Sequence, residues 1–393
     1  MQHDVEPPRV KRLFAAGCAG MFVFGVVLAL LGTLFGLPEM RARMHVDLAQ
    51  QGNLFFLLFL GVCSSTLAAG PLIDNLGHKL ILLWSSLLVA GGLLGFVAAW
   101  SPASASLAAL VIGLGGGGLN TAANVLVSDV YAHNRGPMMN LLGMFYGIGA
   151  LFVPLLVASI AGTVSMTAIL TVTAALPLAC AVLYALSRFP QAREAHGMSR
   201  SELVAVLRYP GLLVFAALLF FESGNEAALG GWSSSYVGSL GASERTATWI
   251  LSGYWLALIA GRFLVFKILA RASKTRFVLL TALGSAASCA LLLWARTLAS
   301  TATAVMLAGL TFAGIYPTVL ALVGDRYQRY AGTVFGVLFA VGLAGGAVSP
   351  WAVGQISQVW RLRAGMVVPL AGTIAVTVLA AIVRRRSEAA SGR

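Results

Sequence analysis

Charged side chains are scarce in this chain of 393 residues: Asp, Glu, Lys and Arg make up 10% of it, whereas hydrophobic residues make up 59%. The mean hydropathy is +0.88, so most of the chain cannot be the charged shell of a water-soluble fold. Strand-length segments of alternating hydrophobicity are also missing, which leaves helices as the structure that crosses the membrane. The composition therefore predicts an all-α integral membrane protein.

The chain also lacks the motifs of common enzymes and metal proteins. It has no phosphate-binding G-x-x-x-x-G-K-S/T sequence, which argues against ATP-driven transport. Its five histidines fall in expected loops or tails, and its four cysteines fall in apolar segments without metal-ligand spacing. We therefore expect no enzymatic activity, no cofactor and no metal.

Apolar runs of about 20 residues, the length that crosses a hydrocarbon core, recur along the chain. We expect six spans in the first half, at 13–36, 54–73, 80–100, 106–128, 139–161 and 165–187. Six more are expected at 211–236, 247–270, 277–295, 301–324, 331–353 and 364–383. The polar stretch between the two sets predicts a cytoplasmic linker at 188–210, which joins an N-terminal six-helix bundle (1–187) to a C-terminal one (211–393).

The formal net charge of +13 reflects the topology. On the twelve-span prediction, most of the 26 Lys and Arg residues gather on one side of the membrane. This is the positive-inside pattern, which predicts cytoplasmic termini and a location in the cell (inner) membrane. Because topology explains the charge, we expect no nucleic-acid partner. The expected partners of this chain, as a monomer, are the lipid bilayer and a small-molecule substrate.

The two halves of the sequence repeat each other. Five residues of the first half have a residue of the same type 196 positions later. They are Asp129, Tyr131, Gly136, Gly149 and Pro154, matched by Asp325, Tyr327, Gly332, Gly345 and Pro350. Parallel six-helix repeats are typical of transporters, with a substrate site near the membrane midplane at the repeat interface. The repeat predicts twelve transmembrane helices in two pseudo-symmetric halves, and alternating access.

The segment "GPLIDNLGHK" (70–79) closes the second span. Gly70 would let helices approach closely, and Asp74 places a negative charge at the cytoplasmic edge of the membrane. The spacing of Gly70, Asp74, Gly77 and Lys79 resembles the loop signature of the major facilitator superfamily. The match departs at Asn75 and His78, where that family commonly has basic residues. The resemblance implies that these four residues form a gate latch; the alternative is an ordinary solvated loop.

Two further acids lie at equivalent cytoplasmic helix ends, and each has an arginine nearby in the sequence. Asp129 lies near Arg135, and Asp325 lies near Arg329. We interpret these four residues as paired gate charges, because symmetric charges at helix ends suit a gate better than ligand binding.

The fourth span contains "GLGGGGLNTAANVLVSD" (113–129). Its glycines allow close helix packing, and Asn120 and Asn124 stand four residues apart on one helix face. An amide is both donor and acceptor, which suits a ligand with hydroxyl or amide groups. The alternative is that both amides bond only to neighbouring helices.

The seventh span contains "GNEAALGGWSSSY" (224–236), with Glu222 just before it. A rise of about 1.5 Å per residue from Gly211 places Glu222 about 17 Å and Glu226 about 23 Å into the bilayer. Intramembrane carboxylates are costly and usually face a cavity or a partner. We therefore expect Glu226 to bind substrate and Glu222 or Glu226 to carry a coupling proton or respond to an ion; an ion pair is the alternative.

Other residues of this span suggest a gate. Gly224, Gly230 and Gly231 would weaken the helix and supply a flexible point for an external gate. Trp232 and Tyr236 suit the aromatic belt at the outer membrane interface.

The tenth span contains "TFAGIYPTVLALVGDRY" (311–327). Tyr316 corresponds to Asn120 in the repeat, and Pro317 can kink the helix and free a backbone carbonyl. A tyrosine beside a broken helix suits a polar ligand, with simple packing as the alternative. Arg262, in the eighth span, is expected to pair with an acid or to extend its charge towards the cytoplasm.

Several segments together resemble the fucose permease branch of the major facilitator superfamily. "NTAAN" (120–124) and "MNLLGMFYGIGALFVPLL" (139–156) are similar to its fourth and fifth helices. Five residues match its seventh-helix pattern, namely Gly224, Glu226, Gly230, Trp232 and Tyr236. The resemblance implies a twelve-helix sugar:proton symporter. The sequence departs from this branch in three places. Span one has no acid, and Asn120 stands where the branch has a glutamate. Gly143 and Tyr146 replace polar residues that face the sugar in fucose carriers.

The first hypothesis is a secondary transporter of a sugar or similar small polar solute, with H⁺ or Na⁺ as co-ion where transport is coupled. Asn120, Asn124, Glu226 and Tyr316 would contact the substrate, and Trp232 and Tyr146 would stack on it. The alternatives are an exporter of an amphipathic compound or lipid, an uncoupled uniporter, and a membrane receptor that transports nothing.

Overall fold

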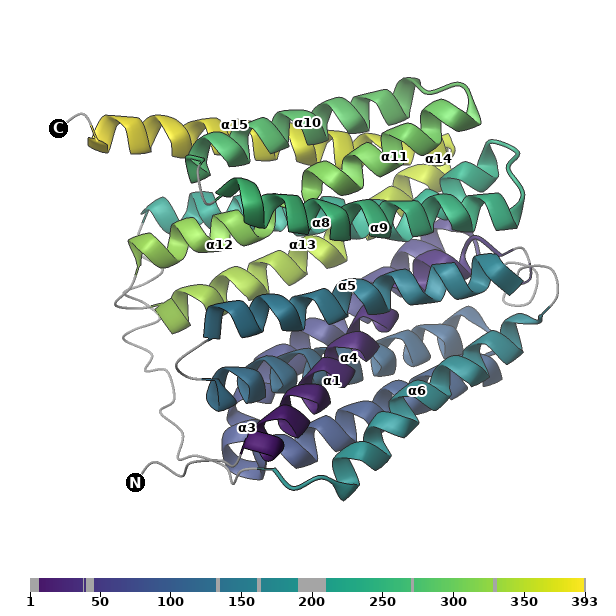
Figure 1. Cartoon of the computed structure of the whole chain (residues 1–393). Helices are drawn as coiled ribbons and strands as arrows, with labels where there is room; N and C mark the ends of the chain where they lie inside the picture. Colours follow the sequence, from purple (N-terminus) through teal and green to yellow (C-terminus); the bar gives the residue numbers. More distant parts are fainter. Residues whose placement is uncertain are drawn as a thin grey trace. The chain divides into compact units, whose positions relative to one another are not determined.

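The computed structural model describes residues 7–37, 39, 46–131, 135–160, 164–189, 210–269, 272–327 and 331–391. Most of the expected linker, residues 190–209, lies outside these ranges. The described residues divide into two compact units (Figure 1). One is drawn from residues 1–34, 39–45 and 57–196, and the other from 35–38, 46–56 and 197–393. We call them the N-terminal and C-terminal units.

The first half of the chain forms five long helices. They are α1 (Pro7–Leu34), α3 (Leu48–Ala98), α4 (Pro102–Val130), α5 (Arg135–Ile160) and α6 (Met166–Leu186). Helix α3 has 51 residues, about twice the length that a membrane needs, and covers the second and third expected spans. At Gly77 its backbone has φ 81° and ψ 161°, a conformation that a side chain would strain. The expected loop at residues 70–79 is therefore a kink inside a long helix.

The second half forms the remaining described helices. They are α8 (Pro210–Ser239), α9 (Glu244–Leu269), α10 (Lys274–Trp294), α11 (Leu298–Phe312), α12 (Ile315–Arg326), α13 (Ala331–Trp360), α14 (Leu362–Gly365) and α15 (Val367–Ser391). The tenth span is interrupted between α11 and α12, because Pro317 has no N–H to donate to the carbonyl of Ala313. The break lies where the sequence predicts one.

Eleven of the described stretches are long and apolar enough to cross a membrane, and α3 supplies two spans. The prediction of twelve transmembrane helices in two pseudo-symmetric halves is confirmed. The repeat extends to the helix starts, since Ser101 and Ser104 form a capping box on α4, and Thr297 and Ser300 form one on α11. Each box satisfies N–H groups that a helix start leaves without an intrahelical acceptor.

The repeat also appears in how the helices pack inside each unit. Helix α1 packs along α5 in the N-terminal unit, as α8 packs along α13 in the C-terminal unit (Figure 1). Gly149 of α5 contacts the backbone carbonyl of Phe22, and its repeat partner Gly345 of α13 contacts that of Phe220. A Cβ atom at either glycine would overlap that oxygen. The repeated glycines are therefore points of close approach in both helix pairs.

We expect Gly345→Ala to lower the free energy of unfolding by about 1–3 kcal/mol, because α13 has to move away from α8. Gly336→Ala is the matched control in the same helix, since no heavy atom outside its own helix backbone and adjacent residues lies within 4 Å of where its Cβ would be. The thermal midpoint of the purified protein in detergent measures both effects. Equal midpoints for the two variants would contradict the assigned contact.

Candidate functional site

An acid and a base meet within the C-terminal unit. The carboxylate of Glu226 on α8 lies 3.8 Å from the guanidinium of Arg262 on α9. Tyr254, also on α9, donates a hydrogen bond of 3.2 Å to the backbone carbonyl of Glu226. The side chains of Glu226 and Arg262 are 16% and 31% exposed, so the pair is open to a ligand. Of the two roles expected for Arg262, the structure shows the ion pair.

Tyr316 adds a phenol to this ion pair. It follows the break between α11 and α12 and lies near enough to Glu226 and Arg262 for electrostatic interaction with both. Its ring stacks on Phe339 of α13, with ring centroids 6.4 Å apart and planes inclined by 20°. We call Glu226, Arg262 and Tyr316 the Glu226 cluster. It brings an acceptor, a cation and a hydroxyl from three helices together in an apolar unit.

The second carboxylate of α8 has different surroundings. Glu222 is fully buried, and among the described residues neither of its carboxylate oxygens has a hydrogen-bond partner. Asn225, three residues later, is 1% exposed, and its amide oxygen and nitrogen also have no described partner. The two carboxylates that the sequence singles out therefore lie in unlike environments one helical turn apart.

The predicted asparagines of the N-terminal unit bond mainly to each other. The amide nitrogen of Asn124 donates to the backbone carbonyl and the side-chain oxygen of Asn120, at 2.8 and 3.0 Å. It also lies 3.7 Å from the sulfur of Met21 on α1. Both asparagines are half-buried. Tyr146 is half-buried too, with its ring 5.6 Å from that of Phe24.

The aromatic residues of α8 do not form an interfacial belt. Trp232 and Tyr236 are fully buried, and they donate hydrogen bonds to the carbonyls of Pro350 and Leu292. Trp232 also packs on Phe55, with ring centroids 5.8 Å apart. The belt interpretation is therefore wrong, because both side chains pack inside the C-terminal unit. Trp232 has no exposed surface for a substrate in this structure, and its role stays a prediction.

The glycines of α8 do not interrupt the helix. Helix α8 runs unbroken from Pro210 to Ser239. Gly224 packs on Ser349, Gly230 on Trp255 and Gly231 on Phe55. At each glycine, the side chain of a neighbouring residue occupies the space that a Cβ would need. The expected flexible point in this helix is wrong for this structure, and the glycines serve close packing.

The expected gate residues have specific partners. His78 lies 3.5 Å from Asp129, and Lys79 donates a 2.6 Å hydrogen bond to the last turn of α6, at the carbonyl of Ala185. Asp325 pairs at 2.6 Å with Lys274. Lys274 thus holds the position expected for Arg329, which lies outside the described residues, as does the side chain of Arg135.

Gly70 and Asp74 have the least support from the described contacts. No heavy atom outside the surrounding helix backbone and adjacent residues lies within 4 Å of where a Cβ of Gly70 would be. Its role in close helix approach therefore stays a prediction. Asp74 is half-buried on α3, three residues before the kink at Gly77, and its latch role stays a prediction.

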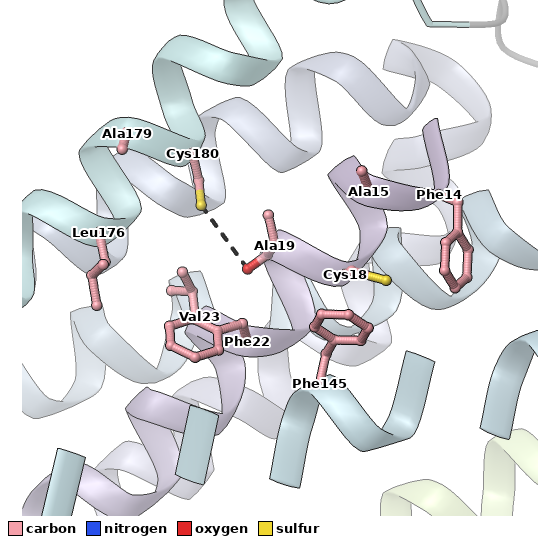
Figure 2. A pocket seen from close by; sticks show the side chains of 10 residues that line it. All are labelled: Phe14, Ala15, Cys18, Ala19, Phe22, Val23, Phe145, Leu176, Ala179 and Cys180. Carbon is pink, nitrogen blue, oxygen red and sulfur yellow. Dashed lines mark hydrogen bonds between the residues drawn. The ribbon is translucent and has the colours of Figure 1, made fainter. Parts of the chain in front are cut away.

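A separate hollow of about 480 Å³ lies in the N-terminal unit, among α1, α5 and α6 (Figure 2). Its wall is almost wholly apolar and includes Phe22, Phe145 and Leu176. The sulfur of Cys180 contacts the carbonyl of Ala19 at 4.0 Å (Figure 2). A polar solute would lose its hydration here without gaining hydrogen bonds, so this hollow is a poor candidate for the substrate site.

The profile of the Major Facilitator Superfamily matches residues 17–239 and 215–393. The chain belongs to this superfamily. Two curated relatives are similar. The sodium-dependent glucose transporter 1 of Rattus norvegicus is 29% identical over 37% of this chain and 30% of its own length. The bypass of stop codon protein 6 of Saccharomyces cerevisiae is 25% identical over 65% of this chain and 56% of its own length. The matches thus span less than two thirds of either relative.

Solved transporter structures share the fold. A D-xylose-proton symporter has a TM-score of 0.79, with 11% identity over 95% of this chain and 96% of its own. The nucleoside transporter NupG has a TM-score of 0.73, with 16% identity over 94% of this chain and 97% of its own. A variant of the E. coli fucose:proton symporter has a TM-score of 0.64, with 20% identity over 94% of this chain and 98% of its own. These likenesses establish the fold of a multi-pass membrane transporter.

Sequence reasoning missed two residues of the C-terminal unit. Asn225 lies in the same polar stretch as Glu226 but was not among the predicted site residues. A buried amide three residues from a carboxylate was the available signal. Tyr254 gave no signal, because its bond to a backbone carbonyl depends on how α9 packs against α8.

We expect Arg262→Met to destabilise the protein by about 1–3 kcal/mol, because it leaves the Glu226 carboxylate without its cation. The double variant Arg262→Met with Glu226→Gln should recover most of this loss, since it removes both charges together.

The exposed pair Lys274 and Asp325 is the control, and Lys274→Met should cost less than about 1 kcal/mol. Thermal midpoints of these three variants, of Glu226→Gln alone and of the unchanged protein form the comparison. A double variant as unstable as the sum of its single changes would contradict a coupled pair.

Proposed function

We propose that this chain is a secondary transporter that moves a sugar or similar small polar solute by alternating access. The observation that carries the proposal is the Glu226 cluster, a partly exposed ion pair with a phenol nearby inside an apolar unit. Ionisable groups at membrane depth are expensive, and they usually mark a substrate or ion pathway. The repeat supports alternating access, which is typical of this architecture.

The substrate class follows from the chemistry of the expected contacts. Asn120 and Asn124 offer amides, Tyr316 a hydroxyl, and Glu226 and Arg262 opposite charges. A solute with many hydroxyl groups can donate to and accept from such a set. Tyr146 and Trp232 are the proposed stacking residues. Similar proteins support this class, because they include transporters of glucose, xylose and fucose.

Coupling to a cation is also part of the proposal. Similar proteins include a sodium-dependent transporter and proton symporters. Span one has no acid and Asn120 replaces the fourth-helix glutamate, so Glu222 and Glu226 are the proposed coupling residues. Because Glu226 already has Arg262 as a cation partner, we assign the coupling cation to Glu222.

We further propose that both termini lie in the cytoplasm of a cell whose inner membrane holds this protein. The concentration of Lys and Arg in the loops on one side of the twelve-span prediction supports this orientation. The gate residues Asp74, Gly77, Lys79, Asp129 and Asp325 would then lie at the cytoplasmic ends of their helices. Arg135 and Arg329 stay proposed partners of that gate.

Uptake of a radiolabelled hexose into proteoliposomes tests the substrate class. We expect saturable uptake that unlabelled hexose competes away, and a loss of about tenfold or more in Glu226→Gln, because the substrate loses a charged hydrogen-bond acceptor. Asn124→Ala should raise KM.

Glu244→Gln, the same chemical change at the start of α9, is the control and should transport normally. Uptake of a nucleoside but no hexose would overturn the sugar assignment. Efflux of an amphipathic drug without uptake of either solute would favour the exporter.

A further inference from the structure

We propose that Glu222 and Asn225 form a binding site for one sodium ion inside the C-terminal unit, separate from the Glu226 cluster. The inference rests on the proposed transport function only for its role in coupling. Its structural basis is a set of buried oxygen atoms that lack hydrogen-bond donors.

Three oxygen atoms on one turn of α8 have no described partner. They are the two carboxylate oxygens of Glu222 and the amide oxygen of Asn225, whose residues are 0% and 1% exposed. An unpaired charged group at full burial in a membrane is among the most costly arrangements in a protein. A counter-ion among these atoms would remove that cost.

Helix α15 packs against α8, the helix that carries these oxygens. Gly372, the residue before Thr373, packs directly on the amide of Asn225. The amide of Asn225 therefore lies against the α15 backbone, next in sequence to Thr373, and a side chain at residue 372 would overlap that amide.

Thr373 can supply a further oxygen ligand. Its hydroxyl donates a 2.8 Å hydrogen bond to the carbonyl of Leu370, which leaves the lone pairs of the oxygen directed elsewhere. Together with Glu222 and Asn225, this gives a carboxylate, an amide carbonyl and a hydroxyl. Oxygen ligands of this kind are those that hard cations prefer.

Charge balance indicates a monovalent ion. Glu222 and Glu226 carry two negative charges when ionised, and Arg262 balances one of them. One added positive charge neutralises the group, whereas a divalent ion would leave an excess. A proton would also restore neutrality, but it could serve only one pair of the oxygens that lack donors. A metal cation takes several oxygen ligands at once, and this favours sodium.

Equilibrium binding of radioactive ²²Na⁺ to the purified full-length protein, in choline buffer of constant ionic strength, tests the site. We expect saturable binding of one ion per chain and a thermal midpoint that rises with Na⁺ concentration, because the ion binds the folded state. Glu222→Gln should abolish both effects. Asn225→Leu and Thr373→Val should each weaken binding by about tenfold or more.

Glu244→Gln is the matched control and should bind as the unchanged protein does. The two milder variants keep the test valid if Glu222→Gln does not fold. Absence of Na⁺ binding in the unchanged protein would overturn the proposal, as would full binding by Glu222→Gln. A midpoint that responds to pH but not to Na⁺ would also overturn it and assign a proton instead.

The proposed transport function is tested apart from this site. Exchange of labelled for unlabelled hexose at equal concentrations needs no ion gradient, so it reports substrate transport alone. Hexose exchange without Na⁺ binding would overturn the sodium site but support the proposed transport function. Na⁺ binding without hexose transport would leave the site and overturn the substrate assignment.

Discussion

A carboxylate inside a hydrocarbon layer has to be neutralised, and α8 carries two of them one helical turn apart. The helices around α8 differ in what they offer. Helix α9 brings Arg262 to Glu226, and α12 adds the hydroxyl of Tyr316. Glu222, by contrast, has no hydrogen-bond partner among the described residues. The chemistry of the C-terminal unit follows from this asymmetry around one helix.

Such an arrangement requires helices that pack closely and hold their register. Gly345 lets the backbone of α13 meet that of α8, and Gly224, Gly230 and Gly231 let other neighbours fill the surface of α8. In a lipid environment, close van der Waals contact is a main source of helix association. The glycines therefore make α8 a well-packed support for its two acids, which is the reverse of the flexible gate expected from helix propensity alone.

Local patterns in the sequence predicted much of the architecture. Hydrophobic length predicted the spans, and the 196-residue repeat predicted two pseudo-symmetric halves. Proline chemistry predicted the break before Tyr316. Features that depend on neighbours could not be read in this way. The burial of Trp232 and the kinked continuity of α3 depend on how distant helices pack and on a single glycine backbone angle.

The same limit applies to the candidate site. The cost of a buried charge identified Glu222 and Glu226 as important, but their sequence context is nearly identical. Only the three-dimensional arrangement distinguishes them, because Arg262 lies 36 positions from Glu226 in the sequence and 3.8 Å from it in space.

This distinction bears on how the protein can work without an acid in span one. A carboxylate that already has an arginine partner gains little from a cation and can offer its oxygens to a substrate. A carboxylate without such a partner depends on a cation to be stable where it is. On the proposed function, Glu226 and Glu222 divide substrate contact and cation binding between them. Because both lie on one rigid helix and their charges interact, occupancy of one site changes the electrostatic energy of the other. Such a direct interaction provides the energetic coupling that symport requires.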